Sequence, residues 1–144
     1  MNFSVRKASF PDAHKIAQME SAYIDCPWSE EQVRAEIENA DALFFVAEEA
    51  GEVIGYISGV IAADECEVSN IAVEKAYRRQ KVGSGLFAEL IDKSAQRGVK
   101  RLFLLVDSDN IAAISLYEKI GFGRVGLRRG YYTSGDAIVM RLEL

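Results

Sequence analysis

Residues 71–87 read Ile-Ala-Val-Glu-Lys-Ala-Tyr-Arg-Arg-Gln-Lys-Val-Gly-Ser-Gly-Leu-Phe, and this stretch decides the fold. Its first three residues end an apolar, β-branched run over residues 65–73, which predicts a strand. Beyond the charged middle, apolar residues recur at the spacing of one helix face: Leu86, Phe87, Leu90 and Ile91. This helix is expected to end at Gly98. The chain is therefore expected to pass here from a strand, through a charged loop, into a helix.

The loop between that strand and that helix has the features of a phosphate site. Gly83 and Gly85 let the backbone come close to a ligand. The free N–H groups and the dipole of a helix N-terminus favour an anion. Three basic side chains add positive charge: Arg78, Arg79 and Lys81. We therefore expect a phosphate-bearing ligand, and a plain glycine-rich turn is the alternative.

Two common nucleotide-binding motifs do not fit this loop. A P-loop needs Gly-Lys followed by Ser or Thr, and that sequence is absent. In the dinucleotide-binding fold the first glycine closely follows its strand, and an acidic residue is expected ~20 positions later. Here nine residues separate Val73 from Gly83, and position 105 is Leu. We therefore reject both motifs.

Working outward, the sequence predicts the element order β-α-α-β-β-β-α-β-α-β-β. The first helix is expected to begin after a cap at Asp12, and the second after the capping box that starts at Ser29. Gly51 is expected at the turn of a hairpin. The remaining strands are expected at residues 3–5, 43–49, 52–62, 65–73 and 102–106 and on either side of residues 133–136, with a helix ending at Gly121. This order predicts a mixed α/β sheet covered by helices.

The charge is unevenly distributed along the 144 residues. The net charge of −5 argues against nucleic-acid binding as the main role. Residues 1–74 carry 4 basic and 15 acidic side chains, whereas residues 75–101 carry 8 basic and 2 acidic ones. The basic segment suits a polyanionic ligand, and the acidic segment suits a cationic one.

Length and composition limit the class of protein further. One domain over residues 1–144 is expected. The longest charge-free run has 11 residues, fewer than the ~20 of a membrane span, and no secretory signal is recognisable. We therefore expect a cytoplasmic protein with no membrane partner. Cys26, Cys66 and His14 have neither the number nor the spacing of a metal site, so no metal is expected.

Several segments together resemble the acetyl-CoA site of the GNAT N-acetyltransferase superfamily. They are Ile71-Ala72-Val73, the loop from Tyr77 to Gly85, Asn110, and Leu116-Tyr117-Glu118 with Gly121-Phe122. The resemblance covers essentially the whole chain and departs from the usual pattern at Lys81, where glycine is common. It implies a mixed, mostly antiparallel sheet of six to seven strands, with helices on both faces and splayed central strands. Two further segments narrow the resemblance to the bacterial ribosomal-protein-alanine N-acetyltransferases. They are Pro27-Trp28-Ser29 and Arg128-Arg129-Gly130-Tyr131-Tyr132.

The resemblance assigns acetyl-CoA as co-substrate and implies which residues bind it. The N–H groups of Ile71 and Val73, on either side of Ala72, would hold pantetheine and the acetyl carbonyl. One such donor at the thioester oxygen would stabilise an oxyanion. Asn110 would contact the pantetheine arm. The pyrophosphate would lie on the loop residues Arg78, Arg79, Gln80, Lys81, Val82, Gly83, Ser84 and Gly85.

The catalytic residues follow from the same resemblance. Tyr117 is the candidate acid for the departing thiolate. The family's usual glutamate base would stand at position 105, which is Leu here. The histone-type branch places its base at the position of Glu67, and Glu65 lies on the same face of that strand. We rank Glu67 first as base and Glu65 second, with two solvated carboxylates as the alternative.

The acceptor is expected to be the N-terminal α-amine of a ribosomal protein. Substrate contacts are assigned to Trp28, Glu65, Tyr131 and Tyr132. The hairpin after Tyr132 is shorter than in the family, so the peptide slot is expected to differ. An α-amine of pKa ~7.7–8.0 is about one-tenth neutral at pH 7, whereas a lysine amine of pKa ~10.4 is neutral roughly four times in ten thousand. Two alternatives stay open: transfer to a free small amine or polyamine, and an acyl-CoA-binding module without catalysis.

Overall fold

The computed structural model describes residues 2–133 and 135–144. Within them the strands are β1 (Ser4–Lys7), β2 (Ala42–Glu49), β3 (Glu52–Ala62), β4 (Glu65–Val73), β5 (Arg101–Asp107), β6 (Gly123–Tyr132) and β7 (Gly135–Glu143). The helices are α1 (Ala13–Tyr23), α2 (Glu30–Glu38), α3 (Val82–Gln96) and α4 (Ile111–Ile120), with short 3₁₀ helices η1 (Phe10–Asp12) and η2 (Lys75–Tyr77). The predicted element order is confirmed. None of the described helices is long and apolar enough to cross a membrane.

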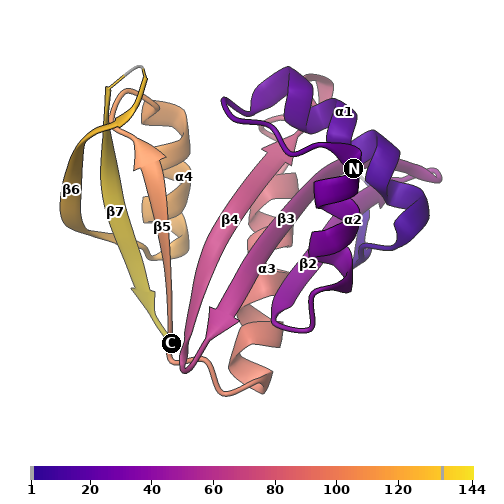
Figure 1. The fold of residues 1–144 in the computed structure, drawn as a ribbon. Helices are drawn as coiled ribbons and strands as arrows, with labels where there is room; N and C mark the ends of the chain where they lie inside the picture. The colour runs from indigo at the N-terminus through magenta and orange to yellow at the C-terminus, as the bar shows by residue number, and fades with distance from the viewer. Residues whose placement is uncertain (1, 134) are drawn as a thin grey trace.

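The strands form one seven-stranded sheet that parts in its middle. Its order is β1-β2-β3-β4-β5-β7-β6, and every neighbouring pair is antiparallel except β4 and β5. These two strands pair only where residues 65–67 lie beside residues 101–103. Beyond that point they diverge, and β5, β7 and β6 lean away from the rest of the sheet (Figure 1). The predicted mixed, mostly antiparallel sheet with splayed central strands is confirmed.

A β-bulge in β4 lies where the two strands separate. Ser58 of β3 pairs with Asn70, and Gly59 pairs with Val68, which leaves Ser69 as an extra residue in β4. A bulge bends its strand and increases the local twist. The bulge therefore helps turn the second half of β4 away from β5.

Each face of the sheet has its own hydrophobic core. Helices α1 and α2 cover one face, and α3 and α4 cover the other (Figure 1). Because side chains alternate along a strand, Phe44 and Val46 of β2 pack with α1 and α2, whereas Phe45 and Ala47 pack with α3. The two layers of helices fix the parted sheet from both sides.

Local signals set several element ends as the sequence predicts. The Ser29 side chain accepts a hydrogen bond from the Gln32 N–H, and the Gln32 side chain accepts one from the Ser29 N–H. This capping box begins α2. Ala50 and Gly51 both have positive φ, at 51° and 80°, as a tight hairpin turn between β2 and β3 requires.

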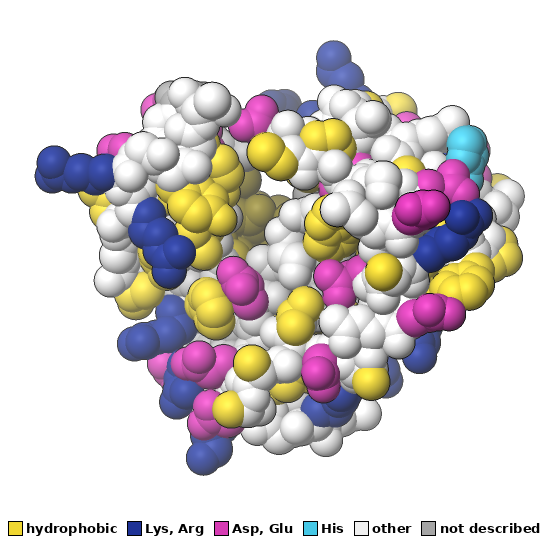
Figure 2. Space-filling model, in the orientation of Figure 1, with side chains coloured by type: hydrophobic (Ala, Val, Ile, Leu, Met, Phe, Trp, Pro, Cys, Tyr) yellow, Lys and Arg dark blue, Asp and Glu magenta, His cyan; other side chains and the backbone are white. Residues whose placement is uncertain are grey.

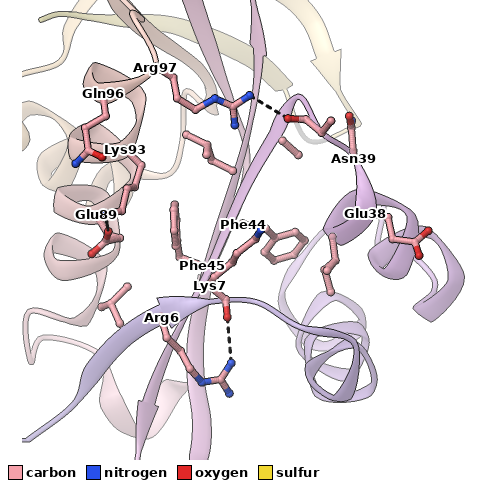
Figure 3. Close-up of a pocket in the computed structure, with 15 residues that line it drawn as sticks. Arg6, Lys7, Glu38, Asn39, Phe44, Phe45, Glu89, Lys93, Gln96 and Arg97 are labelled. Atoms are coloured by element: carbon pink, nitrogen blue, oxygen red, sulfur yellow. Dashed lines mark hydrogen bonds and ion pairs between the residues drawn. The ribbon is translucent and has the colours of Figure 1, made fainter.

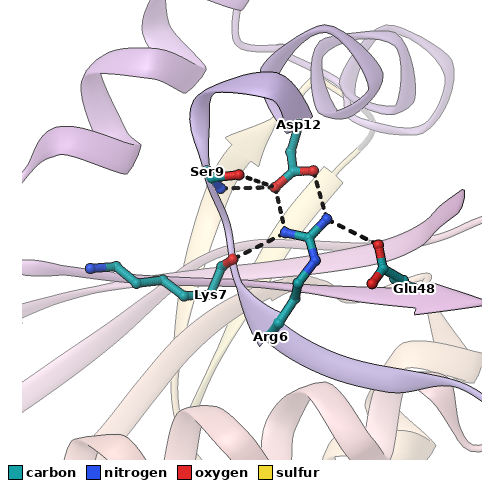
Figure 4. A network of polar contacts seen from close by, with 5 residues as sticks. All are labelled: Arg6, Lys7, Ser9, Asp12 and Glu48. Carbon is teal, nitrogen blue, oxygen red and sulfur yellow. Dashed lines mark hydrogen bonds and ion pairs between the residues drawn. The ribbon is translucent and has the colours of Figure 1, made fainter. Parts of the chain in front are cut away.

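Asp12 is the N-cap residue of α1, as expected, but not through its side chain. Its side chain makes no capping bond to α1; its carboxylate instead accepts hydrogen bonds from Arg6 at 2.8 and 2.9 Å and from the Ser9 N–H at 2.8 Å (Figure 4). Arg6 also donates to Glu48 at 3.2 Å. Burial raises the pKa of Asp12, but the hydrogen bonds from Arg6 and Ser9 outweigh burial and leave that pKa below its ordinary value. Asp12 therefore ties the start of the helical layer to β1.

Candidate active site

The open edge of β4 presents backbone N–H groups that have no strand partner. The Glu74 N–H donates to the Ile54 oxygen at 2.8 Å, and in an antiparallel pair only every second residue points its N–H at the partner strand. The N–H groups of Ile71 and Val73 therefore point away from β3, into the space that β5 leaves open. Between them, the Ala72 side chain is buried on the α1 and α2 face. The structure thus gives these two N–H groups the orientation that a ligand in the gap would need.

The start of α3 adds further backbone donors. Lys81 is the N-cap, with φ 66° and ψ 15°, and Arg79 has φ 64°, so both residues adopt the left-handed conformation. The first N–H groups of a helix have no acceptor within it. In α3 these belong to Val82, Gly83 and Ser84. The Val82 side chain is buried in the core, so only its backbone faces a ligand.

Two side chains of this loop make contacts within the protein. Arg78 donates from Nε to a backbone oxygen of β4 at 3.1 Å, and its guanidinium carbon lies 4.8 Å from the centre of the Tyr23 ring. Gln80 donates to a backbone oxygen of η2 at 3.3 Å. No ion pair involves Arg79 or Lys81 within residues 2–133 and 135–144. These two side chains are therefore the better placed to meet a phosphate.

The two loop glycines are required for packing inside the protein. A Cβ at Gly83 would lie 3.2 Å from Leu116 of α4, and a Cβ at Gly85 would lie 2.9 Å from the Phe3 ring. The absence of a side chain at both glycines therefore serves this packing, and their close approach to a ligand stays a prediction. They allow α3 to approach α4 and the N-terminal segment, and what they offer a ligand is the backbone of the helix start.

A groove of about 590 Å³ opens beside the parted strands. Figure 2 shows a hollow between the β5–β7 part of the sheet and the rest of the molecule, with hydrophobic side chains along one wall. The groove lies between the α1–α2 connection, β4, β5 and the end of β6. Its lining residues are Asp25, Cys26, Trp28, Glu67, Val68, Ser69, Asn70, Leu105, Tyr131, Tyr132 and Thr133. The structure thus brings together Glu67 and three of the predicted substrate residues; Ser134 of the short hairpin lies outside the described residues.

The two candidate carboxylates do not share this groove. Glu67 is exposed and lines it. Glu65 lies where β4 and β5 are still paired, and its carboxylate is 3.4 Å from Arg101. This contact places Glu65 at the closed end of the gap, and its approach to the substrate stays a prediction. Leu105 also lines the groove, so the site has an apolar side chain at the position where the resemblance implies a glutamate base.

Tyr117 lies on α4 in an aromatic cluster and is only 8% exposed. Its ring meets the Phe87 ring edge-on at 5.6 Å between centres and lies 6.2 Å from the Phe122 ring. Burial, with a smaller contribution from Tyr132, raises the pKa of Tyr117 to about 12. Tyr117 is therefore a neutral hydroxyl at physiological pH and a weaker acid than an exposed tyrosine.

The end of β6 is tied across the groove to two other segments. The Tyr132 hydroxyl donates to the Leu105 backbone oxygen at 3.3 Å, and the Tyr131 ring meets the Tyr132 ring edge-on at 4.9 Å. The Thr133 hydroxyl donates to the Asp25 carboxylate at 3.2 Å. These contacts join the β6–β7 hairpin to β5 and to the α1–α2 connection, and so define one wall of the groove.

Asn110 caps α4 with its side chain. Its Oδ1 accepts a hydrogen bond from the Ala113 N–H at 3.2 Å. Because this bond uses the side-chain oxygen, the amide nitrogen is the group left for a ligand. Its role at the pantetheine arm stays a prediction.

A buried polar cluster lies behind the groove and was not predicted from the sequence. Glu20 of α1 is fully buried and accepts hydrogen bonds from the Trp28 N–H at 2.9 Å and from Asn70 Nδ2 at 3.0 Å to each carboxylate oxygen. The hydroxyl of Tyr56, also fully buried, donates to the same carboxylate. A sequence signal was available, because Glu20 lies on the apolar face that Ile16 marks, where a charged residue is out of place.

A second cavity, of about 410 Å³, lies away from these residues. It is enclosed by β1, β2, the end of α2 and the C-terminal half of α3 (Figure 3). Arg97 crosses one end of it and donates to the Ala40 oxygen at 3.0 Å. None of the predicted site residues lines this cavity.

Comparison with known proteins gives four consistent matches. The pattern of the acetyltransferase (GNAT) family matches residues 12–122. The [ribosomal protein bS18]-alanine N-acetyltransferase of Escherichia coli strain K12 is 37% identical, over 98% of this chain and 95% of that protein. N-alpha-acetyltransferase RimI of Mycobacterium tuberculosis is 36% identical, over 92% of this chain and 87% of that protein. The crystal structure of the E. coli ribosomal-protein-S18-alanine N-acetyltransferase superposes with a TM-score of 0.89 at 33% identity and covers 99% of this chain and 94% of that one.

Proposed function

The chain belongs to the acetyltransferase (GNAT) family, and from this premise we propose that it transfers the acetyl group of acetyl-CoA to the N-terminal alanine α-amine of a ribosomal protein. One observation carries this proposal: the gap that exposes the N–H groups of Ile71 and Val73 borders a groove lined by Glu67. The thioester and the amine can therefore meet at one strand edge. The name of the E. coli relative includes its substrate, an alanine of ribosomal protein bS18. This name supports an N-terminal alanine as acceptor.

Residues of this chain fit acetyl-CoA, which supplies the acetyl thioester. The Ile71 and Val73 N–H groups would hold the pantetheine arm and the thioester oxygen. The first N–H groups of α3, with Arg79 and Lys81, would hold the pyrophosphate, since helix N-termini and positive charge both favour phosphate. The excess of basic over acidic side chains in residues 75–101 suits the polyanion. Asn110 would reach the arm through its amide nitrogen.

The reaction is a direct transfer with no acyl-enzyme intermediate. The amine nitrogen attacks the thioester carbon, a C–N bond forms, and an amine proton passes to Glu67, directly or through water. A β4 N–H stabilises the oxyanion while the C–S bond breaks. The electron pair of that bond leaves on the thiolate sulfur.

Tyr117 acts on the thiolate as a hydrogen-bond donor. With its pKa at about 12, full transfer of its proton to a thiolate of pKa ~8.5 would be uphill by roughly 3.5 pKa units, or about 5 kcal/mol. A donated hydrogen bond stabilises the thiolate without that cost. The proton that finally neutralises the thiolate then comes from solvent.

An α-amine acceptor suits a site that has Leu at position 105, where the resemblance implies a glutamate base, and only Glu67 as the proposed base. Because an α-amine is already about one-tenth neutral at pH 7, it needs less help from a base than a lysine amine does. Asp25 and Glu67 line the groove and would attract a cationic N-terminus. The groove is therefore suited to an N-terminal peptide.

The test is to incubate the protein with acetyl-CoA and a panel of acceptors, followed by mass spectrometry. The panel contains peptides with a free N-terminal alanine, peptides with a blocked N-terminus and internal lysines, and polyamines. Acetylation of the alanine peptides at the α-amine is expected. Acetylation of polyamines alone would instead favour a small-amine acceptor, and tight CoA binding without any transfer would favour a non-catalytic module.

A further inference from the structure

Asn70 occupies a position where the groove meets the buried cluster behind it, and its side chain belongs to both. The residue is half-buried, lines the groove, and immediately precedes Ile71, whose N–H faces the gap. Its Nδ2 lies 3.0 Å from both carboxylate oxygens of Glu20. The side chain therefore connects a buried carboxylate to the acceptor side of the site.

The contact with Glu20 decides which way the Asn70 amide points. Carboxylate oxygens accept hydrogen bonds, so the amide nitrogen has to face Glu20 and the amide oxygen has to face elsewhere. No group in the described segments donates a hydrogen bond to Asn70 Oδ1. Because Asn70 and Glu67 both line the groove, this oxygen is an acceptor that a ligand in the groove could use, and an amine is a donor that would satisfy it.

The surroundings of Glu20 hold this amide firmly. The fully buried carboxylate accepts hydrogen bonds from three groups on three different segments: Tyr56 on β3, Asn70 on β4, and the Trp28 N–H before α2. A hydrogen bond donated to a carboxylate polarises the amide and makes its oxygen a stronger acceptor. The same carboxylate also anchors the backbone of Trp28, which lines the groove too.

We propose that Asn70 Oδ1 binds an N–H of the acceptor amine, and that Glu20 is the positioning residue that orients and polarises Asn70 for this contact. This inference rests on the proposed function and names the group that recognises its substrate. A neutral primary amine has two N–H groups and one lone pair. With one N–H on Asn70 and the other directed to Glu67, the lone pair is left for the thioester carbon.

The test compares two variants that each remove one donor from Glu20. Asn70→Ala removes the donor at the groove, whereas Tyr56→Phe removes a fully buried donor that does not line it. With an alanine-first peptide, Asn70→Ala is expected to raise the peptide KM tenfold or more and to leave the acetyl-CoA KM within twofold. Tyr56→Phe leaves the Asn70 and Trp28 bonds to Glu20 in place, so it is expected to raise the peptide KM much less than Asn70→Ala does, although it lowers the Tm. Glu20→Gln is expected to raise the peptide KM and to leave the acetyl-CoA KM unchanged.

A second acceptor makes the test specific for the amine N–H. A peptide that begins with N-methylalanine has one N–H fewer in its neutral form. Wild type is expected to use it at least tenfold less efficiently, by kcat/KM, than the alanine peptide. This discrimination is expected to fall below threefold in Asn70→Ala and to persist in Tyr56→Phe. If Asn70→Ala does not fold, Asn70→Ser, whose shorter side chain does not reach as far, takes its place.

The outcomes separate this inference from the function it rests on. If wild type acetylates the alanine peptide but Asn70→Ala keeps the peptide KM or the discrimination against N-methylalanine, the inference is overturned and the proposed function stands. If Tyr56→Phe changes the peptide KM as much as Asn70→Ala does, Asn70 acts only through stability and the inference is again overturned. If wild type acetylates no alanine peptide, the proposed function fails and the inference fails with it.

Discussion

The N-cap of α3 allows one prediction to be worked out in numbers. Lys81 holds the left-handed conformation, with φ 66° and ψ 15°. This conformation costs a non-glycine residue about 1–2 kcal/mol, whereas glycine adopts it without strain but loses about 0.5–1 kcal/mol more in conformational entropy on folding. Lys81→Gly is therefore expected to raise the free energy of unfolding by about 0.5–1 kcal/mol. At this chain length that gain corresponds to a Tm increase of about 2–3 °C.

Lys81→Ala is the matched control, because it removes the same charge but keeps a Cβ. Its strain remains, so it is expected to be about 1 kcal/mol less stable than Lys81→Gly. Urea unfolding followed by circular dichroism, with a thermal melt of each variant, measures the difference. If the alanine variant is as stable as the glycine variant, position 81 is not strained and the reasoning is refuted.

The same pair of variants separates backbone from charge at the proposed pyrophosphate site. Both variants lose one positive charge, so both are expected to raise the acetyl-CoA KM by the same factor, about two- to fivefold at low salt. The increase is expected to shrink at higher ionic strength, because salt screens charges at the surface. A factor that differs between the two variants would indicate that the backbone conformation, and not the charge, controls binding.

Three further predictions follow from the site and from the N-terminal network. Tyr117→Phe is expected to lower kcat about a hundredfold with little change in the acetyl-CoA KM, and near-normal turnover in a steady-state assay would remove Tyr117 from the mechanism. Glu67→Gln is expected to reduce kcat/KM about tenfold at pH 6 but little at pH 9, where the amine is neutral without help; an unchanged pH–rate profile would dismiss Glu67 as the base. Arg6→Gln is expected to lower the free energy of unfolding by about 1 kcal/mol at pH 7. Because the pKa of Asp12 is lowered in the folded state, its bond with Arg6 stabilises the fold fully above the ordinary carboxyl pKa of ~3.9. This stabilisation is lost as the pH falls through the lowered pKa. Urea unfolding should therefore show the free energies of unfolding of wild type and variant becoming equal in acid.

Much of the fold could be predicted from the sequence because its signals are local. The capping box at Ser29, the positive-φ turn at Gly51 and the helix end at Gly121 each depend on residues a few positions apart. Asp12 stands at the predicted N-cap of α1, but its carboxylate is satisfied by Arg6 and Ser9 and not by the helix, and the Arg6 contact depends on how β1 packs.

The sequence by itself determined the order of strands and helices, the charged loop before α3 and the absence of a carboxylate at position 105, since these are properties of neighbouring residues. Only the tertiary structure decided which side chains share the groove. Glu65 and Glu67 are two positions apart, yet only Glu67 reaches the groove, because β5 stops pairing with β4 just beyond it. Glu20 and Asn70 are 50 positions apart and touch, because α1 packs across β4. Contacts of this kind depend on where a bulge bends a strand and on how helices cover the sheet, and no local pattern in the chain encodes them.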